Sequence, residues 1–260
     1  MISIAAEFAR KMAAIDQWVQ ILDTAFSLGS EDTVALDPTV PIASAAIDLH
    51  NRLRAFGSER LIVPYEGIFL SACADFELAV RGIIDKLVAD IAARKVSYAD
   101  LPEKMRTCHH EGCADIMRNI GWDKYGHLTI ETVVSDLDTC LNPDGNTPYR
   151  IRVEAFSLTD NRNYTATVLK ERLLPLGVKD LWRGLGKDPS LANCLTGSPA
   201  KIDEALSNRL DSIINARNNI VHRGRTGYAV GRQDVCQCCL YLTALVAAMT
   251  SLLTQHLTQV

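Results

Sequence analysis

The sequence predicts an all-α protein, a bundle of helices with an irregular insertion near its middle. Three observations support this fold class. Apolar residues recur at steps of three and four over most of the chain, which is the period of an amphipathic helix. Alternating apolar and charged residues, the pattern of a half-buried strand, occur only in Tyr149–Phe156. With 260 residues, 48% of them hydrophobic and 22% charged, the composition is that of a globular protein and excludes a disordered chain.

The helical period occurs in seven segments, and some of their ends carry helix signals. The segments are 3–28, 42–56, 64–93, 126–141, 163–176, 200–222 and 232–258. The third begins at Pro64, whose fixed φ angle suits the first helical turn. The sixth follows Ser198 and Pro199, a candidate N-cap and first helical residue, and is expected to stop at Gly224. We therefore expect one helical domain over residues 1–260.

Residues 97–160 interrupt this pattern and are expected to form a variable insertion. The turn-rich run NPDGNTP precedes Tyr149–Phe156, so the sequence allows one short strand, hairpin or extended segment there. His109 and His110 stand in the run CHHEGC and are expected in a loop exposed to solvent.

Eight cysteines in a chain without a recognisable export signal argue against a disulfide framework. The runs CHHEGC and CQCC could supply Cys108, Cys113, Cys236 and Cys239 to a structural zinc ion, which takes four such ligands. Neither run has the repeated two-residue spacing of common zinc sites, and a free cysteine in an apolar helix behaves as a small hydrophobic residue. We therefore expect no cofactor, with structural zinc as the alternative.

The most apolar stretch is 16 residues long and begins at Cys238. It is shorter than the roughly 18–20 residues that span a bilayer, so a buried or interface helix is expected. The N-terminal segment carries charged residues inside a helical pattern and has no basic region ahead of an apolar stretch, unlike a secretory signal. We therefore expect a cytoplasmic protein without a membrane partner.

The formal net charge of −4 argues against a general polyanion-binding protein. The charge is unevenly distributed, however. Residues 209–232 hold five arginines and one aspartate, a local net charge of +4, which leaves −8 for the rest of the chain. An acidic body with one basic segment can still attract a phosphate backbone at that segment. Contact with a nucleic acid is therefore expected in one cleft rather than over the whole surface.

Arg217, Asn218 and His222 carry the candidate chemistry, close to the end of the helix predicted for residues 200–222. Asn218 and His222 are four residues apart and share a helix face, whereas Arg217 lies about 140° round the helix from His222. Histidine can exchange a proton with a hydroxyl near neutral pH, and arginine can stabilise charge on phosphoryl oxygens. Asparagine can orient either partner. These residue types suit cleavage of an RNA phosphodiester without a metal ion.

Three further arginines, Arg223, Arg225 and Arg232, surround the glycine-containing loop that follows this helix. Basic side chains position a nucleic acid by contacting its phosphates and do not read its sequence. We expect these three residues to bind RNA.

The run ARNNIVH matches the Arg-Asn-x-x-x-His signature of the HEPN superfamily, and the surrounding sequence resembles the RiboL-PSP branch of that superfamily. Val63–Ile84 resembles the first core helix of the branch, with Glu77 directly after an aromatic residue. Asn163–Trp182 resembles the element that precedes the signature helix, and a long apolar helix follows the signature. The resemblance covers residues 60–258, apart from the insertion at 97–160.

The resemblance implies an all-α bundle that forms a homodimer, in which the signature helices of two protomers meet at one composite cleft. It implies that Arg217 and His222 are the catalytic pair, that Asn218 is the adjacent polar residue, and that Glu77 supports Arg217. The expected activity is metal-independent endoribonuclease cleavage of RNA by the 2′-hydroxyl, in a toxin or antiviral defence effector. An antitoxin or a defence complex is then a further expected partner. The alternative is a non-catalytic module of the same superfamily that binds nucleotides, RNA or protein.

Overall fold

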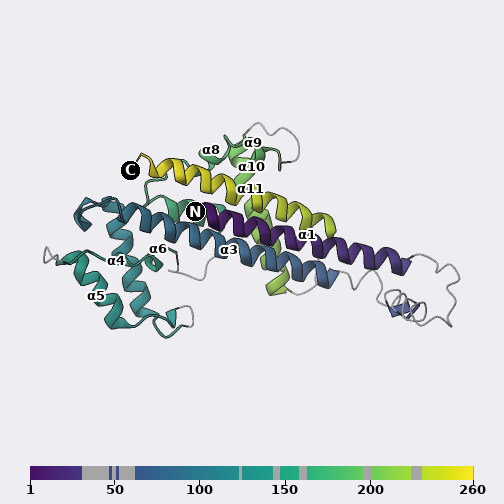
Figure 1. Ribbon diagram of the computed structural model, residues 1–260, viewed down its shortest axis with the longest axis horizontal. Coiled ribbons are helices and arrows are strands. Elements are labelled where there is room, and N and C mark those ends of the chain that lie inside the picture. The colour runs from purple at the N-terminus through teal and green to yellow at the C-terminus, as the bar shows by residue number, and fades with distance from the viewer. Residues whose placement is uncertain are drawn as a thin grey trace.

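The computed structural model describes residues 1–30, 47–48, 51–52, 62–122, 125–142, 147–157, 163–195, 201–223 and 230–259. Three long helices lie side by side along the molecule (Figure 1): α1 (Ile2–Ser30), α3 (Ile62–Ala92) and α11 (Arg232–Leu257). A fourth, α10 (Ile202–Arg223), crosses behind them in that view. The prediction of an all-α fold is confirmed.

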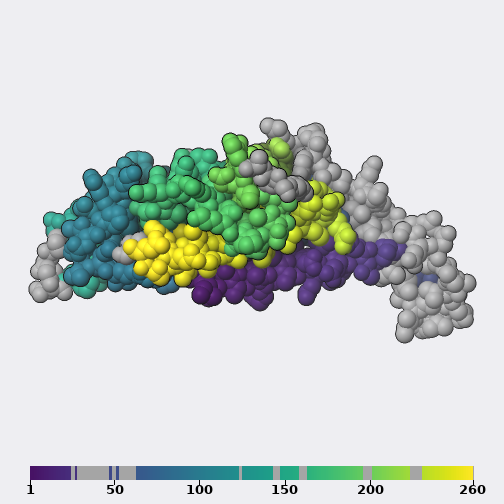
Figure 2. Space-filling model, turned by 90° about the horizontal axis from the view of Figure 1, so that it is seen from above, coloured from purple at the N-terminus to yellow at the C-terminus, as the bar shows by residue number. Residues whose placement is uncertain are grey.

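Seven shorter elements complete the described part of the chain. They are the 3₁₀ helix η2 (Tyr98–Asp100) and the helices α4 (Glu103–Arg118), α5 (Ile130–Leu141), α6 (Glu154–Ser157), α7 (Ala166–Leu173), α8 (Leu181–Leu185) and α9 (Pro189–Ala192). Helices α4, α5 and α6 gather at one end of the molecule (Figure 1). Helices α7 and α8 pack on α10, and α8 and α9 pack on α11. In Figure 2 the green segment that contains α7 to α10 lies on one side of α11 and the purple α1 lies on the other.

Helix α3 is the centre of the fold, because it contacts α1, α6, α10 and α11. Its fully buried side chains recur at helical steps and cover more than one face; among them are Phe76, Val80, Ile83, Ile84 and Leu87. Burying each such side chain contributes roughly 1.5–3 kcal/mol. The polar residues on the side of α3 that faces α10 therefore lie on a helix that is packed into the core.

By length and composition, α11 is apolar enough to cross a membrane, a test that the core helix of a soluble protein also passes. Its apolar residues are used in the bundle, where α11 packs against both α1 and α3. The buried ones include Val235, Leu242, Leu245, Met249 and Leu253. This packing agrees with the buried helix predicted from Cys238 onward.

The irregular insertion predicted for residues 97–160 is wrong for Glu103–Arg118, which forms the regular helix α4. Helix α5 agrees with the helical period predicted for residues 126–141. Gly112 allows α4 to approach α6, since a Cβ atom at this position would overlap the carbonyl oxygen of Ala155. Polar and glycine residues in the run HHEG hide the helical period of α4 in the sequence. The helix is nevertheless strongly amphipathic, with Met105, Cys113 and Ile116 fully buried.

The short strand that the sequence allows at Tyr149–Phe156 does not form, and no strand occurs among the described residues. The backbone of this segment bonds to side chains instead of a neighbouring strand. The Arg150 N–H donates to Thr139 Oγ1 at 2.9 Å, and the Arg152 N–H donates to His109 Nε2 at 2.9 Å. From Glu154 the chain continues as α6.

His109 is buried on α4, so the prediction of a solvated loop is wrong for this residue. Its Nε2 accepts the Arg152 N–H, so Nδ1 carries the ring hydrogen and donates to Tyr98 Oη at 2.9 Å. The ring also stacks on Phe156, with 7° between the ring planes. Burial, with smaller contributions from His110 and Arg152, lowers the pKa of His109 to about 4.

Parts of two sequence predictions lie outside the described residues. Of the helix predicted for 42–56, only residues 47–48 and 51–52 are described, and these are helical. Ser198, Pro199 and Gly224, the predicted boundaries of the sixth segment, are not among the described residues.

Candidate active site

Helix α10 carries the three candidate catalytic residues and has a buried and an exposed side. Acidic residues Asp203 and Glu204 occupy its first turn, where negative charge is stabilised by the helix dipole. The buried side consists of Leu206, Leu210, Ile213 and Ile214. The exposed side consists of Asn208, Ser212, Asn215, Val221 and His222. Arg217 and Asn218 are half-buried and therefore lie at the border between the two sides.

Arg217 and Asn218 are bonded to each other and to a residue from outside α10. Arg217 Nη1 donates to Asn218 Oδ1 at 3.1 Å. The same oxygen accepts a hydrogen bond from Asn163 Nδ2 at 2.7 Å. One carbonyl oxygen therefore fixes three side chains in a single cluster, although Asn163 is 55 residues away in the sequence.

Glu77 of α3 lies close enough to Arg217 for their charges to interact. Burial raises the pKa of Glu77, and the positive charges of Arg217 and Arg81 lower it by less. Its Oε1 is buried and makes no hydrogen bond within the described part of the chain. Glu77 is thus a partly desolvated acceptor beside two guanidinium groups.

Arg81 stands one turn after Glu77 on α3, and Asp85 stands one turn after Arg81. This row of alternating charge continues into the neighbouring segments, because Asp85 Oδ1 accepts a hydrogen bond from Ser157 Oγ at 2.6 Å. Burial raises the pKa of Asp85, against the lowering effects of Ser157 and Arg81. The row links the candidate site to the end of the molecule that holds α6.

His222 lies in the last turn of α10 with its side chain exposed, and it makes no hydrogen bond or ion pair with another described residue. It is five residues after Arg217, so the two Cα atoms are about 7.5 Å apart along the helix axis and about 140° apart around it. The imidazole is therefore accessible, while Arg217 is anchored toward α3.

Of the three arginines expected to bind RNA, the structure describes the side chain of Arg232. Arg232 forms an ion pair with Asp23 of α1, and the same carboxylate accepts a hydrogen bond from Tyr65 Oη at 2.7 Å. Its charge therefore already has a partner that ties α11 to α1. Arg225 and the side chain of Arg223 lie outside the described residues.

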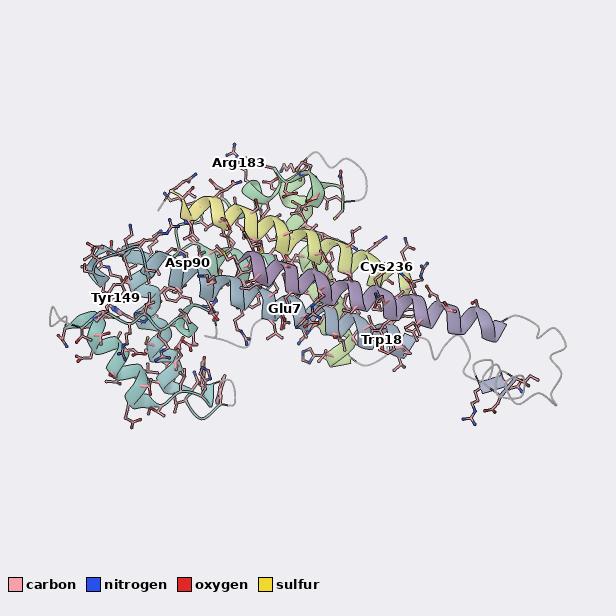
Figure 3. The ribbon with its side chains drawn as sticks, viewed as in Figure 1. Glu7, Trp18, Asp90, Tyr149, Arg183 and Cys236 are labelled. Atoms are coloured by element: carbon pink, nitrogen blue, oxygen red, sulfur yellow. The ribbon has the colours of Figure 1, made fainter. Side chains whose placement is uncertain are left out.

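The cysteines suggested as zinc ligands are divided between two distant helices. Cys108 and Cys113 lie on α4, and Cys236 and Cys239 lie on α11. Figure 3 shows Cys236 and Tyr149, which lies beside the α4–α5 end, at opposite parts of the molecule. The described residues contain no group of three or more His, Cys, Asp or Glu that could hold a metal ion.

Two neighbours of the site were not assigned a role from the sequence. Arg81 could have been found from its position one turn after Glu77 on a predicted helix. Asn163 opens the run that resembles the element before the signature helix, but its spacing to Asn218 carries no periodic signal. Only the packing of this segment on α10 shows that the two residues meet.

Comparison with known proteins gives one match. The model of the RiboL-PSP-HEPN family matches residues 44–255, which is most of the chain. Searches of curated proteins and of solved structures found no match. The matched region includes α3 and α10 with Glu77, Arg217, Asn218 and His222, and membership supports a ribonuclease-type or RNA-binding module. The chain belongs to the RiboL-PSP-HEPN family of the HEPN superfamily.

Proposed function

We propose that this protein is a metal-independent endoribonuclease that cleaves RNA by attack of the 2′-hydroxyl on the neighbouring phosphate. The observation that carries the proposal is the pairing of an anchored Arg217, held by Asn218 and flanked by Glu77, with an accessible His222 on the same helix. An anchored guanidinium is pre-oriented for a phosphate, and an exposed imidazole is free to move protons.

In this mechanism the 2′-oxygen attacks phosphorus and the 5′-oxygen leaves. His222 takes the proton of the 2′-hydroxyl or gives a proton to the leaving 5′-oxygen. Arg217 stabilises the negative charge that grows on the non-bridging oxygens. The products are a 2′,3′-cyclic phosphate, or its hydrolysed form, and a 5′-hydroxyl. The 2′-hydroxyl is the nucleophile, so no metal-bound water is needed.

The site is proposed to be composite, with α10 of two protomers facing each other. Within one protomer Arg217 and His222 lie about 140° apart around α10, so their side chains leave the helix in different directions. The exposed side of α10 is mostly polar. A polar surface is more typical of a cleft that holds RNA than of a dry interface between two proteins. Two opposed copies would supply two histidines, one for each proton transfer.

The proposed setting is the cytoplasm, and the proposed role is that of a toxin or antiviral defence effector. RNA is the substrate, and a second copy of the chain is the first partner. An antitoxin or a defence complex would restrain such an enzyme, because unrestrained RNA cleavage harms the cell that makes it. These proposals rest on the family and on the proposed chemistry.

The test is cleavage of RNA by the purified protein in the presence of a chelator, comparing the unchanged protein with Arg217→Ala and His222→Ala. We expect cleavage by the unchanged protein and at least about a 100-fold lower rate for each variant. Asn208→Ala, on the exposed side of α10 and about four turns before His222, is the matched control and should keep the rate. Equal rates for all four proteins would contradict the proposal. Tight RNA binding without cleavage by the unchanged protein would favour the non-catalytic alternative.

A further inference from the structure

The orientation of the Asn218 amide is fixed by the two residues that bond to it. A guanidinium group can donate hydrogen bonds but cannot accept them. The Asn218 atom that faces Arg217 Nη1 at 3.1 Å is therefore the carbonyl oxygen Oδ1. Since Asn163 contacts the same oxygen at 2.7 Å, it must present its own Nδ2. The Nδ2 of Asn218 then points away from both, and it makes no hydrogen bond with another described residue.

Asn163 is delivered to this position by a segment that is fastened to α10 at two points. The Ala166 N–H, at the start of α7, donates to Asp211 Oδ1 at 2.8 Å. Asp211 and Asn218 are seven residues apart, which is about two helical turns, so they lie on the same face of α10. Residues 163–166 therefore run along that face, with Asn163 at the end nearest to the candidate site.

We propose that Asn163 is a positioning residue of the active site. It holds the carbonyl of Asn218 inward, so that the Asn218 NH₂ group and the remaining N–H groups of Arg217 are presented together to the phosphate. This inference rests on the proposed ribonuclease function. The non-bridging phosphate oxygens only accept hydrogen bonds, so an outward NH₂ group adds a donor, whereas an outward carbonyl would repel them.

Asn163 acts through Asn218 and does not itself contact the RNA. Its amide group matters because its Nδ2 donates to Asn218 Oδ1, an atom that can only accept. A carboxylate at position 163 can only accept, so it would attract the NH₂ group of Asn218 and turn the amide round. Asn163→Asp is thus a substitution of nearly equal size that would turn the carbonyl of Asn218 outward in place of its NH₂ group.

The experiment compares Asn163→Asp and Asn163→Ala in the RNA cleavage assay. We expect kcat to fall about 100-fold for Asn163→Asp, which reverses the amide, and about 10-fold for Asn163→Ala, which only frees it. KM should change less than about 2-fold, because a donor that acts mainly on the charge of the transition state affects kcat more than substrate binding.

Thr165→Ala is the matched control, because Thr165 caps α7 in the same segment without touching Asn218. It should lower the melting temperature and leave kcat unchanged. A loss of kcat in Thr165→Ala equal to that in Asn163→Ala would show that the segment matters only for stability, and would overturn the proposal.

A double-mutant comparison tests whether Asn163 works through Asn218. If it does, the combined variant Asn163→Ala/Asn218→Ala should be no slower than Asn218→Ala alone. Independent, additive losses from the two substitutions would contradict the proposed route.

A readout without RNA separates this inference from the proposed function. The Asn218 NH₂ signals in a nitrogen-15 NMR spectrum can be assigned from their loss in Asn218→Ala. In Asn163→Asp these signals should shift and exchange more slowly with solvent, because the NH₂ group then donates to the introduced carboxylate. Unchanged signals would overturn the positioning role even if the protein cleaves RNA. Shifted signals in a protein that does not cleave RNA would refute only the ribonuclease function.

Discussion

The buried His109 should make the protein lose stability as the pH falls from about 6.5 to 4. Its Nε2 accepts the Arg152 N–H, so a proton added there would replace an acceptor with a second donor. Burial lowers the pKa of His109 to about 4, against about 6.5 for an unfolded chain. The unfolded state therefore binds this proton first, and stability is lost as the pH decreases.

The size of the effect follows from that difference in pKa. Each unit corresponds to about 1.4 kcal/mol, so His109 accounts for a loss of about 3 kcal/mol between pH 7 and pH 4. The shift is large enough to matter in a fold with a typical stability of about 5–15 kcal/mol. His109→Gln removes the titration but keeps a polar side chain.

Urea denaturation of the unchanged protein and of His109→Gln at several pH values measures this contribution. We expect the unchanged protein to be more stable at pH 7 and the difference between the two to shrink by about 3 kcal/mol by pH 4. His127→Gln is the control, because the His127 side chain is exposed and its contact with Glu154 is a surface pair. A difference between the unchanged protein and His109→Gln that is constant with pH would refute the reasoning.

Two further predictions concern the support of the site and the packing of α4. Glu77→Gln should lower the rate of RNA cleavage about 10-fold, because Arg217 loses its negative neighbour. The same variant should be no less stable at pH 7 than the unchanged protein. Burial raises the pKa of Glu77, so its ionised form is unfavourable in the folded state. Cleavage assays check the first outcome, and urea denaturation at pH 7 and pH 4 checks the second. Gly112→Ala should destabilise the protein by about 1–3 kcal/mol, because the new Cβ would overlap the Ala155 carbonyl. Gly121→Ala is its control, because no atom lies within 4 Å of a Cβ built there, and an equal effect of the two substitutions on the melting temperature would contradict this account.

The long helices and the residues of the candidate site on α10 could be predicted from the sequence. Helices α1, α3, α10 and α11 bury continuous apolar faces, so their residues repeat at the helical period. Arg217, Asn218 and His222 lie within one helix, where spacing alone fixes their relative positions. Glu77, the residue proposed to support Arg217, is indicated by the family resemblance and not by spacing.

Helix α4, the segment Tyr149–Phe156 and the position of Asn163 could not be predicted, because they depend on contacts that produce no periodic pattern in the sequence. Helix α4 was missed because buried His109 and close-packed Gly112 occupy positions where an apolar residue would be expected. The alternation in Tyr149–Phe156 resembled a strand, but its backbone is satisfied by Thr139 and His109 side chains. Asn163 reaches Asn218 only because residues 163–166 pack along α10.

The most direct test of the central claim is to replace the ribose at one cleaved bond with 2′-deoxyribose. The proposed chemistry requires the 2′-hydroxyl of that residue as the nucleophile. We predict that the purified protein in chelator cleaves the all-ribose oligonucleotide to a 2′,3′-cyclic phosphate and a 5′-hydroxyl, and leaves the substituted bond intact. Cleavage of the deoxyribose-containing bond at a similar rate, or products that carry a 5′-phosphate, would contradict the account.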